Sequence, residues 1–227
     1  MLSASNFSYS LLSEQLQDST EQLQIPYFSQ WESPSSAPDI LSRSKGLEEI
    51  SEWPQSGALS QEEFIEWANH VCGMCCLKMA LAAKTGKVVP ILELTRRSLP
   101  YGAYVREGKN IRGLIYAPFV AFLKHELDIA GQVRVEMAVE DIEAELAEHQ
   151  FFIASVHPDI RHPDIAPPRT GGHLVLVTQV EAGVITFHNP SGHDEATQSY
   201  VRLPISQFGQ FFAGRGVALM AKSASRL

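Results

Sequence analysis

Hydrophobic and polar residues follow two different patterns along this chain, and the change falls at about residue 150. Before it, apolar residues recur every three or four positions, which is typical of helices that bury one face. After it, short β-branched or apolar runs are separated by turn residues, which is typical of strands. Helices that come first and strands that come second predict an α+β fold with a helical lobe and a sheet lobe.

Five segments of the first part are predicted to be helices. Ser60 stands at an N-cap position with Glu63 three residues on, a capping-box pattern that predicts a helix start. Another segment ends at Gly86, a residue type that often caps a helix, and its Ala-rich face predicts close packing. The segments are 59–71, 75–86, 88–94, 110–127 with a restart after Pro118, and 139–149.

The second part contains five runs of strand length, each bounded by turn residues. One further short strand is predicted earlier, at 25–31, and a short helix or turn at 204–212. FFAGRG (211–216) is interpreted as a turn into the last strand rather than as an anion site. The five runs are 151–156, 173–180, 183–188, 199–204 and 216–221.

One domain with an N-terminal extension is predicted. The chain has 227 residues, which is enough for one good-sized domain and few for two. Residues 1–24 are rich in Ser and Gln and are interpreted as an extension or a loosely packed helix. Within the domain, 25–227, the stretch 32–60 holds many breaker residues and is interpreted as a long surface insertion.

The formal charge of −8 argues against several classes of partner. Nucleic-acid binding depends largely on Lys and Arg that neutralise phosphates, and an acidic chain is not attracted to an anionic membrane surface. No apolar run approaches the roughly 20 residues that cross a bilayer. We therefore expect neither a nucleic-acid nor a membrane partner, and the sequence carries no indication of the oligomeric state.

The three cysteines, Cys72, Cys75 and Cys76, are too close together to form a disulfide framework. This indicates a reduced protein, and an N-terminus unlike a signal peptide adds to the prediction of a cytoplasmic location. A zinc site would need a second cluster, so neither a metal nor a cofactor is predicted. The histidines that do not show standard zinc-ligand spacing are His157, His162, His188 and His193.

Cysteine-based acyl chemistry is indicated by Cys72, which opens the helical run CGMCCLKMAL. The thiolate is the attacking species, and a helix N-terminus beside an imidazole is expected to lower the pKa of the thiol. GGHLVLVTQV and ITFHNPSGH follow along the chain. Cys72, His173 and Asn189 therefore fall in the order nucleophile, base and orienting amide.

The runs that carry His173 and Asn189 are joined by EAG, which predicts a β-hairpin. With the turn centred near residue 182, His173 lies opposite residue 191, and Asn189 is its diagonal neighbour on the same face. A shift of one residue would place the two on opposite faces. In the favourable register, the Asn189 amide accepts the His173 ring N–H and fixes the tautomer that takes the Cys72 proton.

Two further residues are candidates for substrate binding. Gly172 precedes His173 and, having no side chain, would let a substrate backbone approach the imidazole. Arg161 lies in the proline-rich segment 155–172. That segment is either a stiff loop with solvated charges or a cleft wall whose arginines bind a substrate carboxylate.

These motifs resemble those of bacterial papain-like cysteine peptidases related to double-glycine (bacteriocin-leader) peptidases. CGMCCLKMAL is similar to their nucleophile helix, with Met74 where the family usually has Pro. GGHLVLVTQV resembles the histidine strand and FHNPSG the Asp/Asn-Pro strand, and the likeness spans most of 25–221. It implies a papain-like fold whose nucleophile helix packs against an antiparallel β-sheet. By resemblance, Cys72 is the nucleophile, His173 the general base and then acid, and Asn189 the orienting residue.

IPYFSQW resembles the stretch that carries the oxyanion-hole glutamine in that family, which implies this role for Gln30 together with the Cys72 backbone N–H. The gap between the two residues is longer than usual, so the assignment depends on how the insertion folds back. Asn69 and Gln61 are alternative amide donors. Since the chain lacks the membrane spans and nucleotide-binding motor of leader-processing exporters, a stand-alone bacterial enzyme is expected, without their double-glycine specificity.

The predicted function is hydrolysis of a peptide or amide bond by a cysteine peptidase or amidase through a thioester acyl-enzyme. One alternative is an acyltransferase of transglutaminase type, in which an amine resolves the same thioester. A second alternative is a catalytically silent module that binds peptides without cutting them. Silent relatives usually lose the nucleophile or the base, and this chain retains both.

Overall fold

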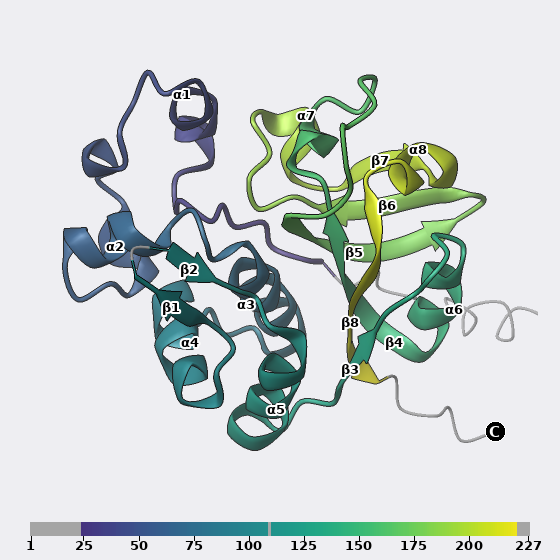
Figure 1. The fold of residues 1–227 in the computed structure, drawn as a ribbon, viewed down its shortest axis with the longest axis horizontal. Helices are drawn as coiled ribbons and strands as arrows, with labels where there is room; N and C mark the ends of the chain where they lie inside the picture. The colour runs from purple at the N-terminus through teal and green to yellow at the C-terminus, as the bar shows by residue number, and fades with distance from the viewer. Residues whose placement is uncertain (1–23, 109, 222–227) are drawn as a thin grey trace, which may run out of the picture.

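The predicted α+β arrangement is confirmed: helices form one lobe and an antiparallel sheet forms the other (Figure 1). The structure is a computed structural model that describes residues 24–108 and 110–221. Its α-helices are α1 (Ala37–Ser42), α2 (Gln61–Trp67), α3 (Cys72–Thr85), α4 (Ile91–Ser98), α5 (Tyr116–Leu127), α6 (Asp141–Glu148), α7 (Glu195–Gln198) and α8 (Ile205–Gly209). Its strands are β1 (Val105–Glu107), β2 (Asn110–Arg112), β3 (Gly131–Arg134), β4 (His149–Val156), β5 (His173–Glu181), β6 (Val184–His188), β7 (Val201–Pro204) and β8 (Phe212–Ala221).

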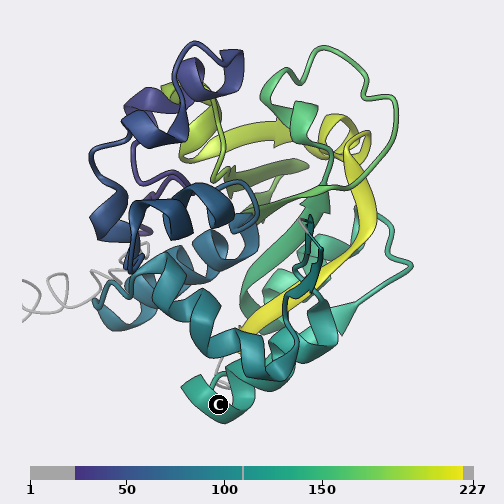
Figure 2. The ribbon, with the colours of Figure 1, turned by 60° about the vertical axis from the view of Figure 1, so that its left-hand side comes forward.

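Helix α3 is the buried centre of the helical lobe, and it packs against α4 and against β5 of the sheet (Figure 2). Every residue from Gly73 to Ala82 is buried, because small Ala and Gly side chains let neighbouring elements approach closely. The helix ends at Gly86, whose φ of 69° is a left-handed C-cap conformation. The predicted end of this helix is confirmed, and its beginning at Cys72 places the candidate nucleophile at the lobe interface.

The main sheet has six antiparallel strands in the order β3-β8-β4-β5-β6-β7. On β5, Leu174 and Leu176 belong to the core shared with the helical lobe, whereas Val175 and Val177 face the core under α6. Both faces of the strand are therefore covered, which explains why the run HLVLV is apolar without alternation.

The structure corrects several of the expected elements. Residues 25–31 form no strand, and the backbone N–H of Gln30 instead donates to Pro190 O in the loop after β6. The hairpin β1–β2 and the strand β3 were not expected, because short, charged and exposed strands have neither apolar runs nor alternation. The segment 211–216 is not a turn, since β8 already begins at Phe212.

The predicted surface insertion, 32–60, is a chain of short helices that folds against α2. It holds α1 and the 3₁₀ helices Pro34–Ser36, Leu47–Glu49 and Trp53–Ser56. A small core of its own joins it to α2, made of Trp31, Ala37, Ile50, Phe64 and Ala68. The N-terminal extension predicted at 1–24 lies outside the described residues, apart from residue 24. Within the described ranges, none of the helices is both long and apolar enough to cross a membrane.

Candidate active site

Cys72 is the first residue of α3, and the backbone N–H groups at this helix end point toward the site. The residue is half-buried, whereas Cys75 and Cys76 are fully buried. Cys75 Sγ donates to Phe28 O at 3.1 Å, and Cys76 Sγ donates to Leu174 O at 3.7 Å. Of the three thiols, Cys72 is thus the one that a substrate or reagent can reach.

Burial raises the pKa of Cys72 above the usual value of a thiol, so the sulfur is protonated at neutral pH. The backbone N–H groups of Leu174, Gly73 and Cys72 itself, and then the charge of Arg161, act in the opposite direction. The lowered pKa expected from the sequence is therefore not found, because removal from water outweighs the helix end. The thiol needs a base.

His173 is held by Asn189, as the hairpin argument predicts. His173 Nε2 lies 2.8 Å from Asn189 Oδ1, and the Ser191 backbone N–H donates to the same oxygen at 3.1 Å. Because a backbone N–H can only donate, the Ser191 contact fixes the amide with its oxygen toward the ring. The ring proton is therefore assigned to Nε2, which leaves the lone pair of Nδ1 free to accept a proton.

The register that brings His173 and Asn189 together depends on a β-bulge. Next to the turn, Glu181 pairs with Val184, but beyond an irregularity at Thr178 the pairing becomes Leu176 with His188. When the Leu176–His188 register is continued along the strands, His173 lies opposite Ser191. The register next to the turn would instead place His173 opposite the residue after Ser191. The predicted pairing of His173 with residue 191 is therefore correct, although the register at the turn differs from it by one residue, because the bulge shifts the register back.

Burial lowers the pKa of His173 from 6.5 to about 3, the charge of Arg161 adds to this, and the Asn189 contact opposes it. The imidazole is therefore neutral near pH 7, which is the form that can act as a base. A protonated thiol beside a neutral imidazole is a pair in which proton transfer accompanies attack on a carbonyl.

Ser191 links the histidine to Arg161, a contact that the sequence did not reveal. Ser191 Oγ lies 3.1 Å from His173 Nε2, and the Arg161 guanidinium donates to Ser191 O at 2.6 Å and to Ser191 Oγ. Arg161 therefore lies on the Nε2 side of the His173 ring, and two of its N–H groups donate to Ser191. The contact with a substrate carboxylate that was considered for Arg161 stays a prediction.

Gln30 lies beside the loop that leads into α3. Its Nε2 donates to Ala68 O at 3.0 Å, which uses one of its two N–H groups, and no described residue accepts from the other. The alternative donors are placed less favourably: Asn69 Oδ1 accepts from Trp31 Nε1, and Gln61 Nε2 donates to Glu48 O in the insertion. Gln30 is thus the buried amide of the three, with a second N–H that no described residue accepts.

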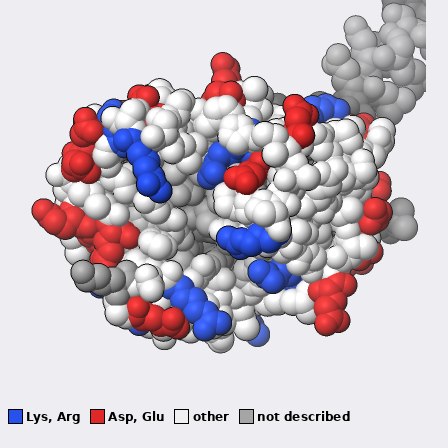
Figure 3. All heavy atoms as spheres, turned by 45° about the horizontal axis from the view of Figure 1, so that its top comes forward, with Lys and Arg blue, Asp and Glu red and all other residues white. Residues whose placement is uncertain are grey.

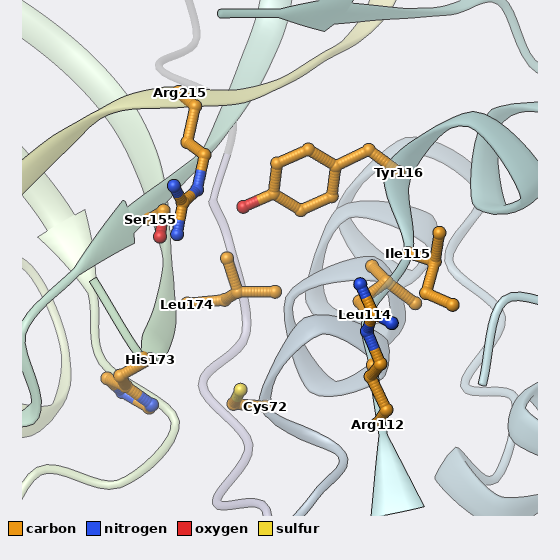
Figure 4. Close-up of a pocket in the computed structure, with 11 residues that line it drawn as sticks. Cys72, Arg112, Leu114, Ile115, Tyr116, Ser155, His173, Leu174 and Arg215 are labelled. Atoms are coloured by element: carbon orange, nitrogen blue, oxygen red, sulfur yellow. The ribbon is translucent and has the colours of Figure 1, made fainter. Parts of the chain in front are cut away.

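A cavity of about 330 Å³ opens where the two lobes meet, and Cys72, Gly172 and His173 line it. In the close-up, the Cys72 sulfur and the His173 ring lie at one end of this cavity (Figure 4). The space-filling view shows a hollow in one face of the molecule with basic side chains beside it (Figure 3). Gly172 has φ +102°, a conformation that side chains rarely adopt, and it is exposed next to His173. Its contact with a substrate backbone stays a prediction.

Two solved structures are similar to part of this chain. No family model and no curated protein matches its sequence. A solved structure similar to it is the peptidase domain of Streptococcus ComA, a bi-functional ABC transporter involved in a quorum-sensing pathway. The identity is 16%, the TM-score is 0.47, and the match covers 68% of this chain and 93% of that one. Another is a double-glycine motif protease from an AMS/PCAT transporter in complex with a leader peptide, at 15% identity and a TM-score of 0.42, covering 66% and 84%.

Both neighbours are peptidase domains of the kind that the sequence motifs resemble. The roles of individual residues in this chain follow from its own geometry and are proposed below.

Proposed function

We propose that the protein is a cysteine peptidase or amidase, with Cys72 as nucleophile, His173 as base and Asn189 as the residue that orients the base. The observation that carries this proposal is the Asn189 contact to His173 Nε2, with the amide fixed by Ser191 N–H. This contact leaves Nδ1 of the neutral His173 imidazole free to accept a proton. His173 lines the same cavity as Cys72, the accessible thiol.

The reaction begins when His173 Nδ1 takes the thiol proton as Cys72 Sγ attacks the substrate carbonyl carbon. The carbonyl oxygen becomes an oxyanion, which accepts from the Cys72 backbone N–H and from Gln30 Nε2. His173 then gives its proton to the leaving nitrogen, so the carbon–nitrogen bond breaks and a thioester remains on Cys72. Water, deprotonated by the same imidazole, releases the acid and restores the thiol.

Incubation with a library of short peptides, read by mass spectrometry, tests the reaction. We expect wild type to yield fragment pairs whose masses sum to that of the peptide plus one water, and Cys72→Ala to yield none. Adding a small primary amine distinguishes transfer from hydrolysis, because an acyltransferase would attach the amine to one fragment. If wild type binds peptides but forms neither product, the protein is a silent binding module and the proposal is wrong.

Gln30→Ala should lower kcat by roughly 10²–10³ with little change in KM, because an oxyanion donor acts mainly in the transition state. Steady-state kinetics on the best library peptide measure the effect. Gln61→Ala removes the same kind of side chain from the start of α2, where its amide donates to Glu48 O of the insertion, and should leave kcat unchanged. Equal kinetics for Gln30→Ala and wild type would remove Gln30 from the mechanism.

A further inference from the structure

The cavity extends beyond the reacting sulfur to a group of polar side chains. Tyr116 at the start of α5, Ser155 on β4 and Arg215 on β8 lie together on its far wall (Figure 4). Arg112, at the end of β2, lines it from the helical lobe. None of these residues is needed for the acyl chemistry proposed above, so their convergence on the cavity calls for another explanation.

The charged side chains that line this cavity are positive. Two arginines line it and no Asp or Glu does, although the chain as a whole carries a formal charge of −8. Among the described residues, no carboxylate lies within 4 Å of Arg215. Arg112 has one partner, Glu107 at 3.8 Å, and both side chains are mostly exposed, so the contact is weak.

The position of Arg215 depends on a glycine. Gly171 has φ +78°, and a Cβ there would lie 3.2 Å from Arg215 Nη2 and 3.4 Å from Ser155 Oγ. The missing side chain therefore leaves room for the guanidinium at the cavity wall. The Tyr116 hydroxyl points toward Ser155 and Arg215 (Figure 4), and burial raises the pKa of Tyr116, so the hydroxyl keeps its proton at neutral pH.

We propose that this far wall binds a carboxylate of the substrate, so that the enzyme acts on peptides or amides with an acidic group close to the scissile bond. The Arg215 guanidinium supplies a planar pair of donors that matches the two oxygens of a carboxylate, and Tyr116 and Arg112 add a donor and a second charge. A positive cavity in an acidic protein also concentrates anionic ligands at the nucleophile. This inference rests on the proposed function for its catalytic meaning, but its binding component can be measured separately.

Two matched alkylating reagents test it without a known substrate. N-iodoacetylglycine and N-iodoacetylglycinamide both alkylate Cys72 with loss of iodide, and they differ only in a carboxylate that reaches past the sulfur. The ratio of their second-order rate constants at Cys72, divided by the same ratio for glutathione, measures carboxylate recognition. We expect this normalised ratio to be about 10 in wild type and to fall by about fivefold in Arg215→Gln, and further in Arg112→Gln/Arg215→Gln.

Arg202→Gln is the control, because Arg202 is exposed on β7, away from the strands that line the cavity, and its loss changes the net charge equally. It should keep the wild-type ratio. A normalised ratio near 1 in wild type, or one that Arg215→Gln leaves unchanged, would overturn the carboxylate site. The rate with the neutral reagent tests the nucleophile itself, so failure of the proposed function is seen independently.

A second pair of reagents identifies the source of the carboxylate. N-iodoacetyl-aspartic acid α-amide carries its charge on a side chain, with N-iodoacetyl-asparagine amide as its neutral match, whereas N-iodoacetylglycine carries its charge at a chain end. A larger preference for the aspartic acid reagent over its neutral match assigns an Asp or Glu side chain of the substrate to this site. A larger preference for N-iodoacetylglycine over its neutral match assigns a terminal carboxylate, and either result supports the site.

Discussion

Lys78→Met should lower the free energy of unfolding by about 3–5 kcal/mol, because it leaves a buried carboxylate without its partner. Lys78 lies in the middle of α3, and its Nζ is 2.8 Å from both carboxylate oxygens of Glu32. The two side chains are 3% and 5% exposed, and the Phe28 ring lies 4.5 Å from Nζ. The pair attaches the segment that carries Gln30 to the nucleophile helix. Urea unfolding at pH 7 measures the change.

The double variant Lys78→Met/Glu32→Gln separates the ion pair from packing. It removes both charges and keeps side chains of similar size, so we expect most of the lost stability to return. An effect below about 1 kcal/mol for Lys78→Met would show that the pair does not stabilise this contact.

The protein should lose stability as the pH falls below 6.5, and His188 should account for a large part of the loss. Its side chain is fully buried between Tyr27 and Tyr200, and neither ring nitrogen has a hydrogen-bond partner among the described residues. Burial lowers the pKa of His188 from 6.5 to about 4. The unfolded chain therefore binds a proton that the folded protein excludes, so stability is full above pH 6.5 and declines toward pH 4.

The shift corresponds to about 2–3 kcal/mol between pH 7 and pH 4.5 for this residue. Urea unfolding at the two pH values should show a correspondingly smaller difference in His188→Phe than in wild type. His125→Phe replaces an exposed histidine and should keep the wild-type difference. His173, whose pKa is lowered to about 3, contributes in the same direction, so some pH dependence remains in His188→Phe. Identical pH dependence in His188→Phe and wild type would contradict the assignment.

Much of the fold could be predicted because local signals and burial agree. The end of α3 at Gly86 and the start of α2 after Ser60 follow from capping, and the Ser60 side chain accepts from Glu63 N–H as expected. The apolar runs gave β4 to β8 with small errors at their ends. By contrast, 25–31 has the composition of a strand, but its Gln30 N–H bonds a loop, and composition does not identify the partner of a backbone group.

The site was predictable where it depends on the order of residues and unpredictable where it depends on three-dimensional detail. The order of Cys72, His173 and Asn189 was readable from the motifs. The bulge at Thr178 that sets their register was not, because nothing in the sequence marks it. The contact between Arg161 and Ser191 was hidden for another reason: it joins residues 30 positions apart whose types are common in loops.

The polar far wall of the cavity could not be predicted from the sequence either. Arg215 stands in a run that was interpreted as a turn, and the positive charge gains meaning only when β8 brings it to the cavity wall beside Tyr116. Side chains from β2, α5, β4 and β8 line this one cavity, so four separate stretches of sequence contribute one residue each. No local pattern could reveal such a set.

The rate of iodoacetamide alkylation at Cys72 across pH 5–9, in wild type and His173→Ala, shows whether His173 activates the thiol of Cys72. Peptide mass spectrometry locates the label, and the buried Cys75 and Cys76 serve as internal controls. We expect wild type to be labelled at pH 7 about 10²-fold or more faster than His173→Ala, because the neutral imidazole removes the proton during attack. His125→Ala should react like wild type. Slow labelling with the same pH profile in wild type and His173→Ala would contradict the claim that His173 activates Cys72.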